Sequence, residues 1–170
     1  DLPMVFSEPE IVLDTLRAQT GWRFAEKGIE VTLKQAEFSG PDATGSARGT
    51  YHTSGDGPGT IDMTAALTRG EARSVWRFMP SVVSEGARYW LRDSLIAGQS
   101  PEAHLVLKGN LADFPFVDKR KGEFVVTVKA NDVVLDYAKG WPRIEGIRGD
   151  LRFEGNGMIV NAQQGRMLGA

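Results

Sequence analysis

The chain has 170 residues, 41% hydrophobic and 25% charged, which is enough for one folded domain with a core. Lys plus Arg number 20 and Asp plus Glu 22, and this near-balance argues against a nucleic-acid binder, which usually carries a basic stripe. The absence of cysteine excludes disulfides, thiolate metal sites and a cysteine nucleophile.

Short alternating segments predict β-strands through about residue 69. In "GIEVTLKQAEF", Ile29, Val31 and Leu33 alternate with polar residues, as in a half-buried strand. "TIDMTAAL" has the same period, and "IVLDTLRAQ" and "GTYHT" are weaker candidates. "SGPDATG" and "SGDGPG" carry the Gly, Pro and Asp that favour turns.

The apolar period then changes to three and four residues. It predicts an inserted amphipathic helical segment at about 71–97, with Pro80 as a break or a new first turn and Gly98 as its end. Its apolar stripe could lie on a membrane surface, but its polar face mixes acidic and basic residues. Packing on the sheet is therefore the simpler expectation.

The last part alternates again and predicts further strands. "EAHLVLKGNL", "GEFVVTVKA" and "DVVLDYA" each place apolar residues on one face, and the change of phase at Asn131–Asp132 predicts a bulge or a turn. The segment 149–169 predicts an antiparallel hairpin around Gly155-Asn156-Gly157. Its expected pairing sets Leu151 and Phe153 opposite Met158 and Val160.

The sequence contains few candidates for catalytic, metal-binding or cofactor-binding residues. His52 and His104 are the only histidines and lie far apart, so we expect no metal site, and no nucleophile motif or cofactor loop predicts a catalytic residue or a cofactor. The acidic residues occupy polar positions of strands or turn edges, as on a solvated sheet face. The run "DKRKGE" is expected to be a soluble hairpin tip rather than an anionic-lipid contact.

Aromatic motifs in the second half carry a resemblance to a known family. They are "WRFMP", "RYWLRDSLIAG", "LVLKGNLADFPF", "GEF", "LDYAKGWPRIEGIRGDLRFEG" and "GRMLG". In this order they resemble the YhdP family of the AsmA-like group, whose relatives include TamB. The resemblance covers roughly the C-terminal 100 residues. The first 70 residues share only short strands and glycine-containing turns with the group, and no fixed motif.

The resemblance implies a large protein anchored in the inner membrane of Gram-negative bacteria and otherwise periplasmic. Such proteins are implicated in moving phospholipids to the outer membrane along curved, incompletely closed β-structures. Because this chain lacks an initial Met and ends in "GRMLGA", we expect residues 1–170 to be one periplasmic section excised from a longer chain. Membrane contact would then occur only through the parent chain.

Alternating strands place apolar side chains on one face of a sheet, and such a face can bind acyl chains through hydrophobic contact without any catalytic group. The alternation therefore provides candidates for contact with acyl chains. The candidates that could line a groove on one face are Leu105, Leu107, Phe124, Val126, Val128, Leu135, Tyr137, Leu151 and Phe153. The same residues could instead be the core beneath the helical segment. Pro115 and Pro142 interrupt pairing, so the aromatic residues Phe114, Phe116, Tyr137 and Trp141 are expected at strand ends or edges, where they could pin a corner or gate the groove rim.

We therefore expect an α+β fold: a twisted, curved antiparallel sheet with an open groove and the inserted helical segment. The expected function is non-enzymatic phospholipid transport, with acyl chains and the flanking sections of the parent chain as partners. The alternative is a structural module that stacks edge to edge in a long β-scaffold without contacting lipid. A hydrolase using paired carboxylates is the least favoured reading.

Overall fold

One antiparallel sheet of eight strands makes up most of the protein, and its strands follow one another in chain order. The computed structural model describes residues 10–25, 28–53, 57–79 and 84–167. The strands are Thr15–Ala25 (β1), Gly28–Ser39 (β2), Ala43–His52 (β3), Thr60–Glu71 (β4), Leu95–Asn110 (β5), Gly122–Leu135 (β6), Ile144–Glu154 (β7) and Gly157–Met167 (β8).

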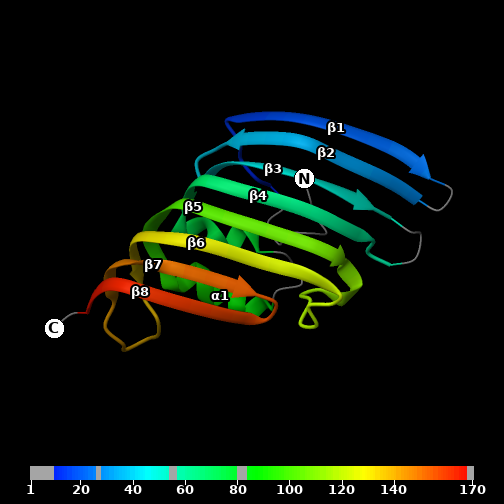
Figure 1. Ribbon diagram of the computed structural model, residues 1–170. Coiled ribbons are helices and arrows are strands. Elements are labelled where there is room, and N and C mark those ends of the chain that lie inside the picture. The colour runs from blue at the N-terminus through cyan, green and yellow to red at the C-terminus, as the bar shows by residue number, and fades with distance from the viewer. Residues whose placement is uncertain (1–9, 26–27, 54–56, 80–83, 168–170) are drawn as a thin grey trace.

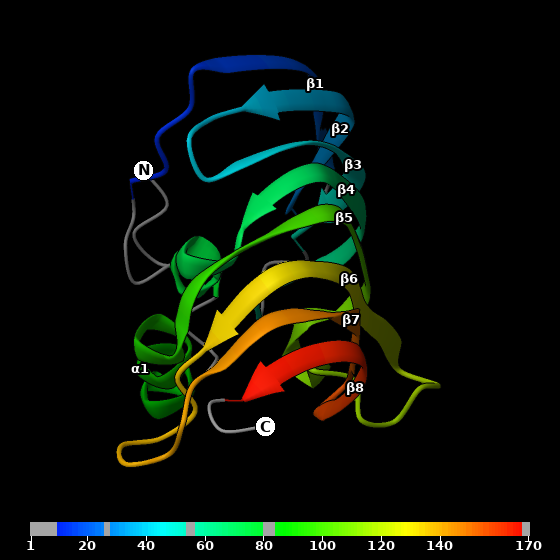
Figure 2. The same ribbon diagram turned by 90° about the vertical axis from the view of Figure 1, so that its left-hand side faces the viewer.

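The sheet is curved and open. Its strands are bowed, and β1 and β8 are the edge strands, each paired on one side only within the described chain (Figure 1). Seen from the side, the sheet bends around the short helices, which lie inside the curve (Figure 2). The prediction of an open, curved antiparallel sheet is therefore confirmed, although the fold is mostly β rather than α+β.

The amphipathic helical segment predicted at about 71–97 is not confirmed. The chain there forms a 3-10 helix, Ala72–Phe78 (η1), and an α-helix, Glu85–Ser94 (α1), while Pro80 lies outside the described residues. Strand β5 already begins at Leu95, opposite Leu135, because pairing with β6 satisfies the backbone at this point. Gly98 therefore lies within a strand instead of ending a helix. A third helix, Leu111–Asp113 (η2), is a single 3-10 turn.

Strand β3 is longer than its sequence suggests. Part of the turn expected in "SGPDATG" belongs to the strand, and the tight turn is confined to 40–42, closed by Gly40 N donating to Ala43 O at 2.9 Å. Gly45 allows this pairing because a Cβ at that position would lie 2.3 Å from Ala66 O. Residues 54–56 of the other expected turn, "SGDGPG", lie outside the described residues.

Two local predictions in the last part are confirmed. The register shifts between Ala130 and Val133, and Asp132 has φ 50°, so the change of phase is a bulge within β6 and not a turn between strands. The terminal hairpin pairs Phe153 with Met158 and Leu151 with Val160. Strand β6 ends at Leu135, however, two residues before Tyr137.

The buried core is small for a sheet of this size. Among the described residues, no large side chain is completely buried. The buried apolar side chains are Ala36, Ala43, Ala103, Phe116, Val125 and Val133. Since a two-layer domain normally buries large side chains between its layers, one face of this sheet lacks a complete covering layer.

Candidate functional site

Cross-strand register places a row of apolar residues, one from each of the eight strands, on one face of the sheet. Residues directly opposite each other share a face, and their side chains alternate along each strand. Leu105 is opposite Val126, which is opposite Phe153, and the same row continues to Met158. In the other direction the row runs through four alanines on neighbouring strands, listed from β4 to β1 as Ala65, Ala47, Ala36 and Ala18. We call this surface the apolar face.

The apolar face contains eight of the nine predicted groove-lining residues. The next rows pair Leu107 with Phe124, and Val128 with Leu151, while Leu135 rejoins this side after the bulge. All eight are partly exposed, and none is buried. Tyr137 is the exception, because it lies beyond the end of β6 and is 51% exposed. Whether any of these residues contacts lipid stays a prediction.

The first half of the chain extends this face, and the predicted set missed it. Trp22 and Phe24 of β1 lie opposite Val31 and Ile29 of β2, and the two aromatic side chains are 70% and 76% exposed. The signal was present in the sequence, because Ile29, Val31 and Leu33 alternate as clearly as the residues of β6. The single sheet was expected, but the sequence did not show the register that places Trp22 and Phe24 on the same face as the residues of β5–β7.

One end of the apolar face is covered by the loop after η2. Phe116 is 3% exposed, and its ring occupies the space above Gly109 and Gly122, where an added Cβ would lie 2.8 and 2.5 Å from it. Phe114 lies 5.0 Å from Phe124, measured between ring centroids. Of the two roles predicted for these aromatics, pinning a corner fits Phe116.

The other end of the strands meets α1. The backbone N of Asp136 donates to Ser94 O at 2.9 Å, and Trp90 Nε1 donates to Tyr137 O at 3.1 Å. Trp90 and Tyr137 also make an edge-to-face contact at 5.9 Å, and Tyr137 lies 5.9 Å from Trp141. These rings form an exposed aromatic cluster beside the helix, in which Trp90 is 40% and Trp141 64% exposed.

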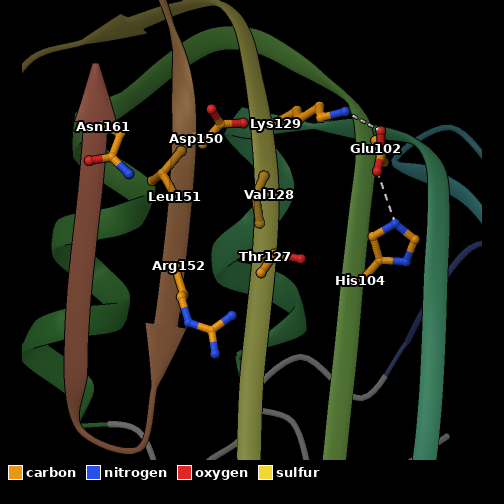
Figure 3. A pocket seen from close by; sticks show the side chains of 9 residues that line it. All are labelled: Glu102, His104, Thr127, Val128, Lys129, Asp150, Leu151, Arg152 and Asn161. Carbon is orange, nitrogen blue, oxygen red and sulfur yellow. Dashed lines mark hydrogen bonds and ion pairs between the residues drawn. The ribbon is translucent and has the colours of Figure 1, made fainter. Parts of the chain in front are cut away.

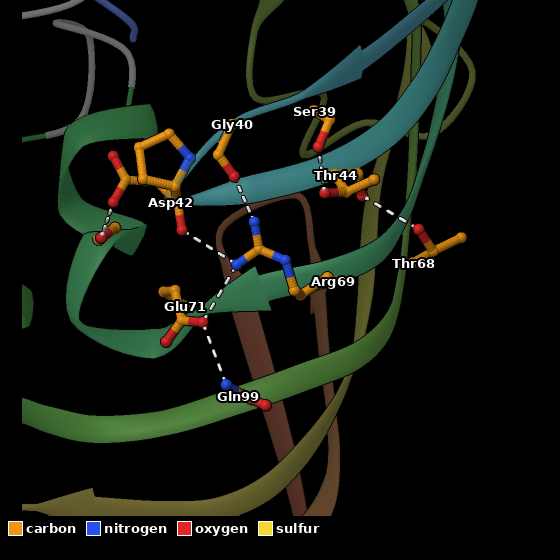
Figure 4. Close-up of polar contacts among 10 residues, drawn as sticks. Ser39, Gly40, Asp42, Thr44, Thr68, Arg69, Glu71 and Gln99 are labelled. Atoms are coloured by element: carbon orange, nitrogen blue, oxygen red, sulfur yellow. Dashed lines mark hydrogen bonds and ion pairs between the residues drawn. The ribbon is translucent and has the colours of Figure 1, made fainter. Parts of the chain in front are cut away.

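A polar network fixes η1 to the β2–β3 turn (Figure 4). Asp42 accepts hydrogen bonds from Ser74 Oγ and Arg77 Nη1, both at 2.6 Å. Arg69 donates to the carbonyls of Gly40 and Pro41. Because these partners come from three separate segments, the network holds the helical connection against the sheet and leaves no obvious group for chemistry.

The opposite face of the sheet is polar and contains a pocket of about 280 Å³ (Figure 3). Seen from this side, the helices lie behind the strands, so they are on the side of the apolar face. In the pocket, Glu102 accepts from Lys129 Nζ at 2.6 Å, and His104 Nε2 lies 3.1 Å from its other oxygen. Lys129, and then His104, lower the pKa of Glu102, while Glu102 raises the pKa of Lys129.

These pairs make the pocket an electrostatically satisfied surface. Arg152, the other cation of the lining, pairs with Glu154 at 3.0 Å. Among the described residues, no group of three or more His, Cys, Asp or Glu side chains is placed to hold a metal ion. Within the same part of the chain, no helix combines the length and apolar character needed to cross a membrane. The apolar face is therefore the best candidate for a functional surface.

Comparison with known proteins identifies the family of the chain. No curated protein and no solved structure matches it. The family model described as YhdP protein matches residues 1–170, so the resemblance seen in the C-terminal motifs extends over the first 70 residues as well. Grouping with the AsmA-like, TamB-related proteins is consistent with this match. The chain belongs to the YhdP family.

Proposed function

We propose that this chain is a non-enzymatic section of a phospholipid-transport protein and that its apolar face accommodates acyl chains. The observation that carries the proposal is a face that is apolar across eight strands yet has no large side chain completely buried within the described chain. Soluble monomers rarely expose contiguous apolar patches beyond a few hundred Å², and larger ones commonly mark binding surfaces.

The energetics suit a hydrocarbon ligand. Each CH₂ group moved from water onto an apolar surface contributes about 0.8 kcal/mol, so two acyl chains need no specific polar contact to bind. The strands also present the face as a continuous surface, because the apolar rows cross every strand from β1 to β8. Chains could therefore shift along it without meeting a charged side chain.

Family membership supports the cellular setting of the proposal. The section would lie in the periplasm, within a parent protein anchored in the inner membrane, and would serve phospholipid movement to the outer membrane. Its partners would be acyl chains and the flanking sections of the parent chain. No catalytic step is part of the proposal.

Photo-crosslinking tests the proposal with controls that the strand period supplies. A photoreactive amino acid is placed at Leu105, Val126 or Phe153, and in control variants at the neighbouring positions 104, 127 or 152 on the polar face. With phosphatidylethanolamine vesicles, we expect crosslinks to lipid at the first set and several-fold fewer at the second. Equal crosslinking from both faces, or none from the apolar face, would contradict the proposal.

The alternative, a scaffold module without lipid contact, is favoured by the two edges. Strands β1 and β8 each have 11 residues, and each has one row of backbone groups without a strand partner in the described chain. Such edges readily pair with another strand. Sedimentation analysis separates the two functions, since a scaffold predicts concentration-dependent oligomers and no lipid crosslinks.

A further inference from the structure

The loop that joins β5 to β6, residues 111–121, crosses the ends of several strands. On one side, Leu111 N donates to the carbonyl of Gly59, the residue before β4, at 2.9 Å. On the other side, the loop reaches the β7–β8 turn, where a Cβ on Gly155 would lie 3.6 Å from Phe116 O. The β5–β6 loop therefore spans the ends of β4, β5, β6 and β7.

Two rings of the β5–β6 loop lie on the apolar face. Phe116 is 3% exposed above Gly122, and Phe114 packs on Phe124 with ring centroids 5.0 Å apart. Gly122 and Phe124 are two residues apart in β6, so they share one face of the sheet. The loop thus closes one end of the apolar face, and Phe114, which is only partly buried, is the ring next to the open rows.

The charged side chains of the β5–β6 loop do not compete for a ligand at this end. Each of its three cations is paired with a carboxylate. The pairs are Lys121 with Asp113 at 2.6 Å, Arg120 with Asp118 at 2.9 Å, and Lys119 with Glu154. The loop therefore presents phenyl rings to the apolar face, and such a surface suits the hydrocarbon end of a lipid rather than its charged headgroup.

The open part of the apolar face beside the loop has the length of an acyl chain. The stretch of β6 from Phe124 to Ala130 covers about 20 Å at about 3.4 Å per residue, and its rows across β5 and β7 contain no charged side chain. The hydrocarbon core of a bilayer is about 30 Å thick, so the chains of one leaflet span about 15 Å. The helical connection follows Glu71 and precedes Leu95, so it lies at the opposite end of β4 and β5.

We propose that the β5–β6 loop is the end wall of the acyl-chain site and that Phe114 limits the length of the chain that the site accepts. Acyl chains lie along the strands with their terminal methyl groups against Phe114. The wall is confined to β4–β7, because Phe24, at the same end of β1, is 76% exposed. This inference rests on the proposed function, since it assigns a length limit to the same apolar face.

Binding of single-chain phosphocholines of increasing chain length, titrated as monomers below their micelle concentrations, tests the limit. Each added CH₂ should tighten binding to the wild-type chain roughly 4-fold until the ligand reaches Phe114, and tightening should then stop. Phe114→Ala should admit about two further CH₂ groups, so the longest ligands should bind at least 10-fold more tightly than to wild type. Phe114→Trp should move the limit to shorter chains. The control Val117→Ala, at a 65% exposed position of the same loop, should leave the limit unchanged.

The outcomes are distinguishable. Tightening that continues to the longest ligand in wild type, or the same limit in wild type and Phe114→Ala, overturns the role of Phe114 and leaves the proposed function standing. Failure of the wild-type chain to bind any member of the series contradicts the proposed function itself.

A second measurement uses only the wild-type chain, so it does not depend on the folding of a variant. Phospholipids that carry a diazirine either at the terminal carbon of an acyl chain or next to its ester are crosslinked to the protein, and mass spectrometry locates the products. We expect the terminal probe to label Phe114 and its neighbours several-fold more than the probe beside the ester. Equal labelling of the loop by the two probes, or stronger labelling by the probe beside the ester, would overturn the end wall.

Discussion

The two faces of this sheet differ in the side chains that they expose to water. On the polar face, charged side chains form pairs across strands, such as Lys108 with Asp62 at 2.7 Å and Lys129 with Glu102 at 2.6 Å. On the apolar face, rows of aliphatic and aromatic side chains cross the sheet and stay partly exposed. The difference indicates that the polar face is complete in water, whereas the apolar face lacks a covering layer.

The largest expected effect concerns the part of the apolar face that the chain covers itself. Phe116 is 3% exposed over Gly109 and Gly122, so Phe116→Ala should lower the free energy of unfolding by about 3 kcal/mol, as for other buried aromatics. Val117 is 65% exposed, and Val117→Ala should change it by less than about 0.5 kcal/mol. Urea unfolding of both variants measures the contrast, and equal effects would show that the loop does not pack as described.

A second comparison places one charge on each face at adjacent positions. Val126 lies between Leu105 and Phe153 on the apolar face, and Thr127 lies beside it in sequence on the polar face. Val126→Asp should weaken phospholipid binding at least about 10-fold, because a carboxylate would have to be desolvated against hydrocarbon. Thr127→Asp should leave binding within about 2-fold, which is under 0.5 kcal/mol.

Equilibrium binding to phosphatidylethanolamine vesicles measures both variants, and their circular dichroism spectra establish that both remain folded. Similar losses in the two variants would mean that charge alone, independent of the face, governs binding. The comparison between the faces would then have no functional meaning.

The fold was predictable from the sequence where a strand carries its own period. The phase change at Asn131–Asp132 was sufficient to locate an irregularity in the pairing, although it left a bulge and a turn as alternatives, and Gly155-Asn156-Gly157 was sufficient to place the hairpin. Strand β3 was not predictable in full, because Gly45 has low strand propensity and is held in the strand by pairing with Phe38 of β2 and Leu67 of β4. Such tertiary pairing leaves no local signal.

The candidate site also has one part that the sequence predicted and another part that it did not. Its residues in β5–β7 follow from alternation, whereas the contribution of β1 and β2 depends on how the two halves of the chain join. The helical segment predicted at about 71–97 is not confirmed as one element, because its three- and four-residue period spans two short helices and the start of β5.

A third prediction compares two glycines on opposite faces. A Cβ at Gly49, in the middle of the apolar face, would lie 2.4 Å from Asp62 O on the neighbouring strand, whereas one at Gly21 on edge strand β1 would meet nothing within 4 Å. Gly49→Ala should therefore cost about 1–3 kcal/mol of stability through overpacking. Gly21→Ala should be neutral or stabilising by up to about 1 kcal/mol, because it restricts the unfolded chain. Equal changes in urea midpoint would contradict the close packing of β3 on β4.

The smallest expected effect concerns an ion pair of the polar face. Lys129, with His104 as the second cause, lowers the pKa of Glu102 from its ordinary value of 4.5, so this pair stabilises the fold above that pH and ceases to do so as pH falls through the lowered pKa. Lys129→Gln should therefore reduce the unfolding temperature slightly at pH 7, and the difference from wild type should shrink as the pH falls below 4.5. Both side chains are about half exposed, so the effect should be small and should weaken further in high salt. A large loss of stability on Lys129→Gln would mean that the polar face, and not only the covered end of the apolar face, holds the sheet together.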